Sequence, residues 1–117
     1  MCTILVLYHA VPDAPMIVAA NRDEFYARGA EPPRVLASSP RIVGGMDPLH
    51  GGTWMGATAD GFFLGLTNQR PQTWPVPEAR SRGLLAAEAL RTGSRVGVRG
   101  LLETVDPCAY NSFNLVF

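Results

Sequence analysis

Two short apolar runs open the chain, and they constrain its fold more than any other feature. Residues 2–8 are almost continuously aliphatic or β-branched, and a proline-containing turn over 12–15 separates them from a second run over 16–20. Runs of this length that stop at turn residues are typical of β-strands. Their closeness along the chain predicts an antiparallel hairpin. We expect the first strand to be buried on both faces, because its side chains are nearly all apolar.

The middle of the chain predicts further short strands. Residues 26–40 show no clear hydrophobic period and indicate an irregular surface segment, and 41–43 is a brief strand candidate. Residues 53–58 and 62–68 flank a turn that contains Gly61. This arrangement predicts a hairpin with glycine at its turn.

Serine caps and apolar spacing predict two helices after these strands. Ser81 is placed to cap a helix that runs to Thr92 with Gly93 as its stop, and Ser94 is placed to cap the next. The second helix has an apolar face at the i, i+3, i+4, i+7 spacing of a helix that lies on a sheet. That face consists of Val98, Leu101, Leu102 and Val105.

The last residues, 111–117, alternate as a strand does, and the sequence stops inside them. A native C-terminus seldom lies in the middle of an apolar strand, so we expect a piece of a longer chain. Five or six strands followed by two helices predict an α+β fold in which one face of the sheet is covered. We expect a second half of the protein to cover the other face.

Composition excludes several classes of function. Ten acidic residues balance ten basic ones, which argues against a nucleic-acid partner and favours a small-molecule ligand. No apolar run is long enough to span a membrane, and no basic segment precedes the first strand, so we expect a cytoplasmic protein. All ten basic residues are arginine, which excludes lysine chemistry. Two cysteines with His9 and His50 do not have the spacing of a zinc site, and we assign neither histidine to a metal or a catalytic triad.

Cys2 is the first candidate for chemistry. A Met before a residue as small as Cys is normally removed, which leaves a thiol and a free α-amine on the same residue. The amine, with an ordinary pKa of about 8, can take the proton from the thiol and act as general base. The alternative interpretation is a small buried apolar residue at the start of a strand.

The tetrad Asn21-Arg22-Asp23-Glu24 follows the second strand, where its side chains can converge on the start of the first. A guanidinium from Arg22 near Cys2 favours the thiolate, and Asp23 can orient the α-ammonium. The alternative is a capped turn with a surface ion pair, which contributes about 0 to 1 kcal/mol and has no function.

Asn68 and Asn111 lie at strand margins, where an amide can donate to a developing oxyanion. Such a donor contributes roughly 3 kcal/mol in other enzymes. The alternative for both is a turn-forming asparagine. The segment Gly51-Gly52-Thr53-Trp54 lets a ligand approach the backbone, or else forms a tight turn with Trp54 facing the core.

Six short motifs are spread in order along the whole chain. They are Met1-Cys2-Thr3-Ile4, Ala19-Ala20-Asn21-Arg22-Asp23-Glu24-Phe25, Gly51-Gly52-Thr53-Trp54-Met55-Gly56, Leu66-Thr67-Asn68, Ser81-Arg82-Gly83 and Tyr110-Asn111-Ser112-Phe113-Asn114-Leu115. Together they resemble the NRDE family, the family of the transport-and-Golgi-organisation-two proteins. The combination is far more specific than any one motif.

The resemblance implies a fold as well as a family. Members are about twice as long as this chain, so residues 1–117 are expected to form the N-terminal half of one domain. That domain resembles the N-terminal-nucleophile hydrolases, an αββα sandwich of two stacked antiparallel sheets between helical layers. Cys2 then lies at the strand start that carries the nucleophile in those enzymes.

The same resemblance implies roles for the site residues. By similarity to bile-salt hydrolases and penicillin acylases, Cys2 is the nucleophile, Arg22 its electrostatic partner and Asp23 the residue that orients the amine. Asn68 and Asn111 are the oxyanion candidates. The arginine and aspartate are further apart in those acylases, which leaves Glu24 as an alternative to Asp23. The expected ligand-binding residues are Asn21, Glu24 and Trp54.

Three functions from different classes remain open, because fold analogy does not establish a reaction. The first is a cysteine amidohydrolase that acts on a small acyl amide and needs no cofactor or metal. The second is a carrier that moves haem or acyl-CoA and other lipids without turnover. The third is a non-catalytic relic that keeps the sheet and the tetrad for stability.

Overall fold

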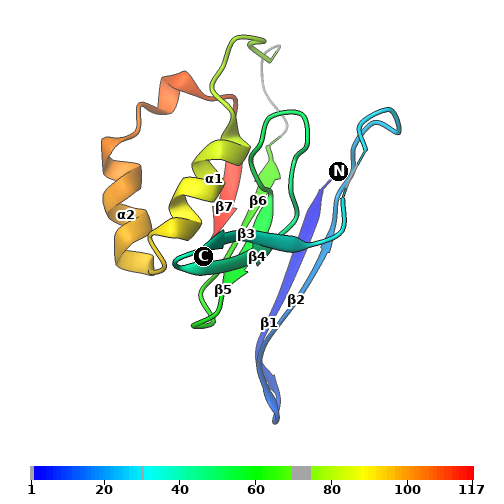
Figure 1. Cartoon of the computed structure of the whole chain (residues 1–117), viewed down its shortest axis with the longest axis vertical. Helices are drawn as coiled ribbons and strands as arrows, with labels where there is room; N and C mark the ends of the chain where they lie inside the picture. Colours follow the sequence, from blue (N-terminus) through cyan, green and yellow to red (C-terminus); the bar gives the residue numbers. More distant parts are fainter. Residues whose placement is uncertain (1, 30, 70–74) are drawn as a thin grey trace.

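The computed structural model describes residues 2–29, 31–69 and 75–117, and its fold is α+β with two antiparallel sheets and two helices (Figure 1). Strands β1 (Thr3–Val11) and β2 (Ala14–Asn21) form a two-stranded sheet. A second sheet has five strands in chain order. Its strands are β3 (Arg34–Ser38), β4 (Arg41–Gly44), β5 (Met55–Thr58), β6 (Phe63–Asn68) and β7 (Phe113–Val116).

The predicted N-terminal hairpin is confirmed, since β1 and β2 pair in antiparallel register from Thr3 opposite Asn21 to Tyr8 opposite Met16. The expectation that β1 is buried on both faces is wrong, because Leu5 is 62% exposed and Tyr8 is 73% exposed. The hairpin extends away from the larger sheet (Figure 1). Only an element packed on both of its faces would bury these side chains, and the described residues supply none.

One end of the hairpin does pack on the larger sheet. A Cβ added at Gly65 of β6 would lie 2.7 Å from Cδ1 of Ile4, so the absence of a side chain at Gly65 lets β1 approach β6 closely. This contact places the residue before β1 beside the end of β6.

Strand β3 corrects the interpretation of 26–40 as irregular throughout. Residues Arg34–Ser38 pair with β4, with a register shift between Val35 and Ala37. Backbone hydrogen bonds to β4 make this strand, and the register shift within its five residues interrupts the alternation that would have revealed it.

The expected strands over 41–43, 53–58, 62–68 and 111–117 are present with shorter or longer bounds. Strand β5 pairs with β6, and Gly61 in the turn between them has φ 86°, a conformation that favours glycine. Strand β7 pairs with β6 at the edge of the sheet.

Both predicted helices are confirmed together with their caps. Helix α1 (Arg82–Arg91) begins at Ser81, whose hydroxyl accepts the Leu84 N–H, and helix α2 (Arg95–Thr104) begins at Ser94, whose hydroxyl accepts the Gly97 N–H. A 3₁₀ turn (Pro107–Ala109) follows α2. Neither helix in the described ranges is long and apolar enough to cross a membrane.

The core lies between the helices and one face of the five-stranded sheet. Its buried side chains come from β4, β6 and both helices, and they are Ile42, Leu64, Leu66, Ala86, Ala89, Leu90 and Val98. Neighbouring strand residues point to the opposite face, where Val35, Val43 and Val116 remain exposed. The helices therefore cover one face of the sheet, and the opposite face is open except where Ile4 of the hairpin packs at Gly65.

Candidate functional site

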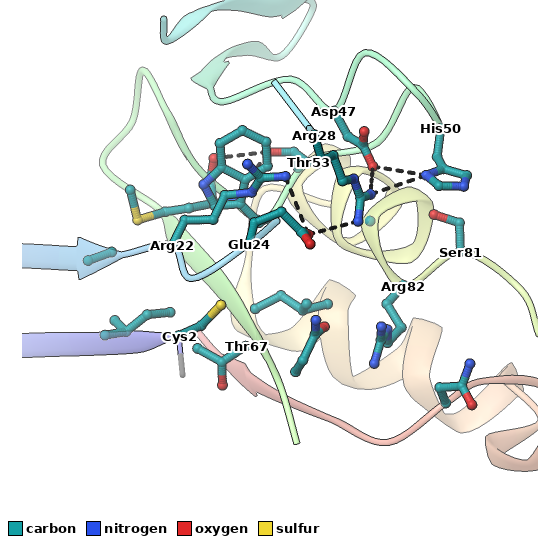
Figure 2. Close-up of a pocket in the computed structure, with 18 of the residues that line it drawn as sticks. Cys2, Arg22, Glu24, Arg28, Asp47, His50, Thr53, Thr67, Ser81 and Arg82 are labelled. Carbon is teal, nitrogen blue, oxygen red and sulfur yellow. Dashed lines mark hydrogen bonds and ion pairs between the residues drawn. The ribbon is translucent and has the colours of Figure 1, made fainter. Parts of the chain in front are cut away.

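A cleft of about 410 Å³ lies where the start of β1, the end of β2, the loop before β5 and the start of α1 come together (Figure 2). These segments are far apart in the sequence. Glycines allow two of them to meet, because the Gly51-Gly52 turn and the Ser81-Arg82-Gly83 segment contact each other backbone to backbone.

Gly52 and Gly83 form that contact. A Cβ on Gly52 would lie 2.3 Å from the carbonyl carbon of Gly83, and the N–H of Thr53 donates to the Gly83 carbonyl at 3.0 Å. No side chain fits at Gly52 unless the start of α1 moves. Two of the six family-like motifs are therefore joined directly at the wall of the cleft.

Cys2 lines the cleft and is half-buried. The register of the hairpin brings it beside the residues that follow β2. The backbone N–H of Asp23 lies 3.4 Å from Sγ and donates to it, and Sγ lies 3.6 Å from the Asp23 carbonyl as a donor. The Asp23 carbonyl can accept from the thiol form of Cys2, and the Asp23 N–H can donate to the thiolate form. Asp23 itself is exposed.

Arg22 lies in the same cleft and contacts two other predicted residues. Its guanidinium carbon is 4.7 Å from the ring centroid of Trp54, and Nη2 is 3.6 Å from a carboxylate oxygen of Glu24. The predicted binding residues Glu24 and Trp54 therefore hold the guanidinium between them. Figure 2 shows Arg22 and Glu24 side by side and the Cys2 sulfur directed into the cleft.

The predicted asparagines also line the cleft, as Asn21 at the end of β2, Asn68 at the end of β6 and Asn111 before β7. Asn111 exchanges two hydrogen bonds with the backbone of Val76, each of 2.8 Å. This pair fixes the segment before α1 against the segment before β7.

Sequence reasoning missed a cluster centred on Arg28. Its guanidinium donates to Glu24 at 2.8 Å and to Asp47 at 2.5 Å, and its Nη2 lies 3.2 Å from Nδ1 of His50. Nδ1 of His50 also lies 3.2 Å from the same oxygen of Asp47. Figure 2 shows the cluster at the end of the cleft opposite Cys2.

Asp47 is the buried member of this cluster, with 7% of its surface exposed. Burial by itself raises the pKa of the Asp47 carboxyl, but hydrogen bonds from the Leu49 N–H, His50 and Arg28, with the charge of Arg28, outweigh it and lower the pKa. Asp47 is therefore an anion at neutral pH that neutralises Arg28.

Arg82 is the first residue of α1 and the middle residue of the Ser81-Arg82-Gly83 motif. Its Nη1 donates to the carbonyl of Ser112 at 3.0 Å. Burial lowers the pKa of the guanidinium, the positive charge of Arg28 lowers it further, and Glu24 partly opposes both.

The sequence contains a local signal for only part of the Arg28 cluster. Asp47 and His50 are three residues apart in a glycine-rich turn, which is a spacing that brings side chains together. Arg28 follows Glu24 by four residues, but its approach to Asp47 spans nineteen and depends on the tertiary fold. No hydrophobic pattern or short motif reports such a contact.

Comparison with known proteins places the chain among described relatives. A family model described as Transport and Golgi organisation 2 matches residues 1–117. The human Transport and Golgi organization protein 2 homolog is 33% identical over 132 residues, which cover 99% of this chain and 44% of that protein. The cattle homolog gives 33% identity with 99% and 44% covered, and the Drosophila melanogaster protein gives 30% with 99% and 45%. The chain spans less than half the length of these relatives.

Proposed function

The chain belongs to the Transport and Golgi organisation 2 family, and from that premise we propose that the cleft is the site of a cysteine amidohydrolase that acts on a small acyl amide. One observation carries the proposal: the Cys2 sulfur lines a cleft, with the Asp23 N–H directed at it from 3.4 Å. A thiolate nucleophile needs a donor in this position and access to substrate, and Cys2 has both.

The proposed reaction begins when removal of Met1 frees the α-amine of Cys2. The amine accepts the thiol proton, and the sulfur attacks the amide carbonyl to form a C–S bond and an oxyanion. Return of the proton to the amide nitrogen breaks the C–N bond and releases the amine. Water then cleaves the thioester, which yields the carboxylic acid and regenerates the thiol.

The neighbouring residues take the following proposed roles. Arg22, held by Trp54 and Glu24, supplies positive charge to the cleft, and Asp23 orients the α-ammonium. Asn68 and Asn111 are the oxyanion candidates. The two bonds between Asn111 and Val76 also make Asn111 a brace for the cleft wall.

The fold belongs to the same proposal. We propose that these residues form the N-terminal half of an αββα sandwich similar to the N-terminal-nucleophile hydrolases. The open face of the five-stranded sheet and the greater length of the relatives support it. A second sheet on that face would cover Val35, Val43 and Val116.

Mass spectrometry of the full-length protein tests the nucleophile. With octanoyl-p-nitroanilide as probe, we expect protein that lacks Met1 and carries one octanoyl group on Cys2. The Cys2→Ala variant should take up none. Cys108→Ala is the matched control, because Cys108 is an exposed free thiol outside the cleft, and it should acylate as the unmodified protein does. Retained Met1, or acylation that persists in Cys2→Ala, would overturn the mechanism.

A carrier of haem or acyl-CoA is the second candidate, and the apolar side of the cleft favours it. Ile4, Met55 and Leu66 line this side and suit an acyl chain or a porphyrin edge. A carrier requires saturable binding of haem or octanoyl-CoA that survives Cys2→Ala, with no turnover by the unmodified protein. If neither probe binds and Arg22→Ala only lowers stability, a purely structural role remains.

A further inference from the structure

The charge of the cleft is unbalanced. Two carboxylates line it, those of Glu24 and Asp47, against twice as many guanidiniums. The arginines are Arg22, Arg28, Arg80 and Arg82. In a chain whose total formal charge is zero, this is a local excess of positive charge.

Ion pairs neutralise two of these arginines. Glu24 lies 3.6 Å from Arg22 and 2.8 Å from Arg28, and Asp47 completes the pairing of Arg28. Both carboxylates of the cleft are thus already engaged, and the excess charge remains on Arg80 and Arg82.

Arg82 is held in position without an ion pair to any described residue. Its guanidinium is half-buried and donates to the carbonyl of Ser112, which is uncharged. Within residues 2–29, 31–69 and 75–117, no carboxylate lies within 4.0 Å of it. Burying a charge costs free energy unless a partner of opposite sign is supplied, so an anion entering the cleft would be attracted to this group.

Arg80 lines the same cleft and is exposed. Its guanidinium carbon lies 5.4 Å from the ring centroid of Tyr110, and its backbone N–H donates to the Ala109 carbonyl at 2.8 Å. The aromatic stack orients the planar guanidinium while its edge donors stay available for a carboxylate or phosphate. Arg80 likewise forms no ion pair among the described residues.

We propose that the ligand of this cleft carries an anionic group, a carboxylate or a phosphate, and that Arg82, assisted by Arg80, binds it. The proposal rests on the proposed function and narrows its substrates to acyl amides whose amine portion is acidic. Figure 2 shows the Cys2 sulfur and the Arg82 side chain both directed into the cleft from different elements. A substrate that spans the cleft would thus present its amide near Cys2 and its anion near Arg82.

Calorimetric titration of the full-length Cys2→Ala variant measures binding without turnover. The probes are N-octanoylglycine, N-octanoyl-O-phosphoethanolamine and the neutral N-octanoylglycinamide. We expect at least one anionic probe to bind about tenfold or more tightly than the neutral one, with a preference that falls as salt is added. The tighter of the two anionic probes identifies carboxylate or phosphate as the natural group.

Substitution locates the anion. When Arg82→Gln is added to the Cys2→Ala variant, we expect the preference for anionic over neutral probes to fall to about threefold or less. Arg82→Lys should retain part of this preference, because the charge remains but the two-point geometry of the guanidinium is lost. Arg95→Gln is the matched control, since Arg95 is exposed on α2 and lies outside the cleft. Equal binding of anionic and neutral probes overturns the proposal, as does a preference that survives both Arg82 variants.

The outcomes separate this proposal from the proposed function. If the unmodified protein hydrolyses N-octanoylglycine and N-octanoylglycinamide equally well, the hydrolase proposal is supported and the anion-site proposal is contradicted. If the anionic probes bind more tightly than the neutral one and no amine is released, the anion-site proposal is supported and the hydrolase proposal is contradicted. The salt dependence of probe binding needs no Arg82 variant, so the test holds even if such a variant fails to fold.

Discussion

Arg28 connects two segments of the cleft wall through one guanidinium. It donates to Glu24 after β2 and to Asp47 in the loop before β5, and His50 of the same loop lies beside it. Asp47 is buried and carries the charge that opposes Arg28. Removing that charge therefore costs more stability than breaking an ion pair on the surface. Asp47 is therefore the residue at which the integrity of this wall is best tested.

We expect Asp47→Asn to lower the free energy of unfolding by about 1–3 kcal/mol at neutral pH. The amide keeps the shape of the side chain but loses the charge that holds Arg28 and His50. Urea unfolding of both proteins measures the difference. Asp60→Asn, at an exposed turn, is the control and should change stability by less than about 0.5 kcal/mol.

The effect of Asp47→Asn should depend on pH in a definite direction. The folded-state pKa of Asp47 is lowered from its ordinary value of 3.8, so its contribution to stability is present above that pH. The contribution disappears as pH falls through the lower folded-state pKa. We expect the two unfolding free energies to converge on acidification below pH 3.8, and a gap that widens there would contradict the assignment.

At the scale of elements, the approach of the loop before β5 to the start of α1 sets the shape of the cleft. We expect Gly52→Ala to lower the free energy of unfolding by about 2 kcal/mol or more, since its Cβ meets the backbone of Gly83. Thermal unfolding measures the loss, and binding of the cleft probes should weaken in parallel. Unchanged stability would show that α1 moves at little cost.

Gly100→Ala is the opposite case on α2. A Cβ at Gly100 meets nothing within 4 Å. In a helix interior, alanine is more favourable than glycine by about 0.8–1.0 kcal/mol. We expect a gain in stability of up to that amount, measured by the same unfolding experiment. Gly97→Ala should not show it, because that Cβ would lie 2.6 Å from the Cβ of Thr92.

Local signals explain which elements were predictable. Ser81, Ser94 and Gly93 determine the ends of the helices through bonds within a few residues, so their positions follow from the sequence. Strand β3 owes its structure to β4, and the Arg28–Asp47 bond owes its existence to the packing of two loops. Such features depend on contacts that a single sequence does not display.

At the scale of the whole molecule, the hairpin β1–β2 exposes apolar side chains on both of its faces. Leu5 and Val6 point to opposite faces, and they are 62% and 41% exposed. A continuously apolar strand predicts burial, but the sequence does not say whether its own residues or others provide the cover. The α+β class was therefore predictable while the burial of β1 was not.

We expect the 117-residue chain alone to self-associate through this hairpin, because it forms a large exposed apolar surface. The double variant Leu5→Lys, Leu7→Lys should shift light scattering toward the monomer and reduce binding of a hydrophobic dye. Val96→Lys is the control, since Val96 is exposed on α2 away from the hairpin. Identical behaviour of the double variant and the unmodified chain would exclude the hairpin as the contact.

The guanidinium stacked on Trp54 has a practical consequence for following ligands. Indole emission responds to the charge beside the ring, so displacement of Arg22 by a bound molecule alters an optical signal that the protein already contains. The sequence holds one other tryptophan, Trp74, and its replacement by phenylalanine leaves Trp54 as the single indole. Occupancy by a ligand that displaces Arg22 is then read without labels and in real time.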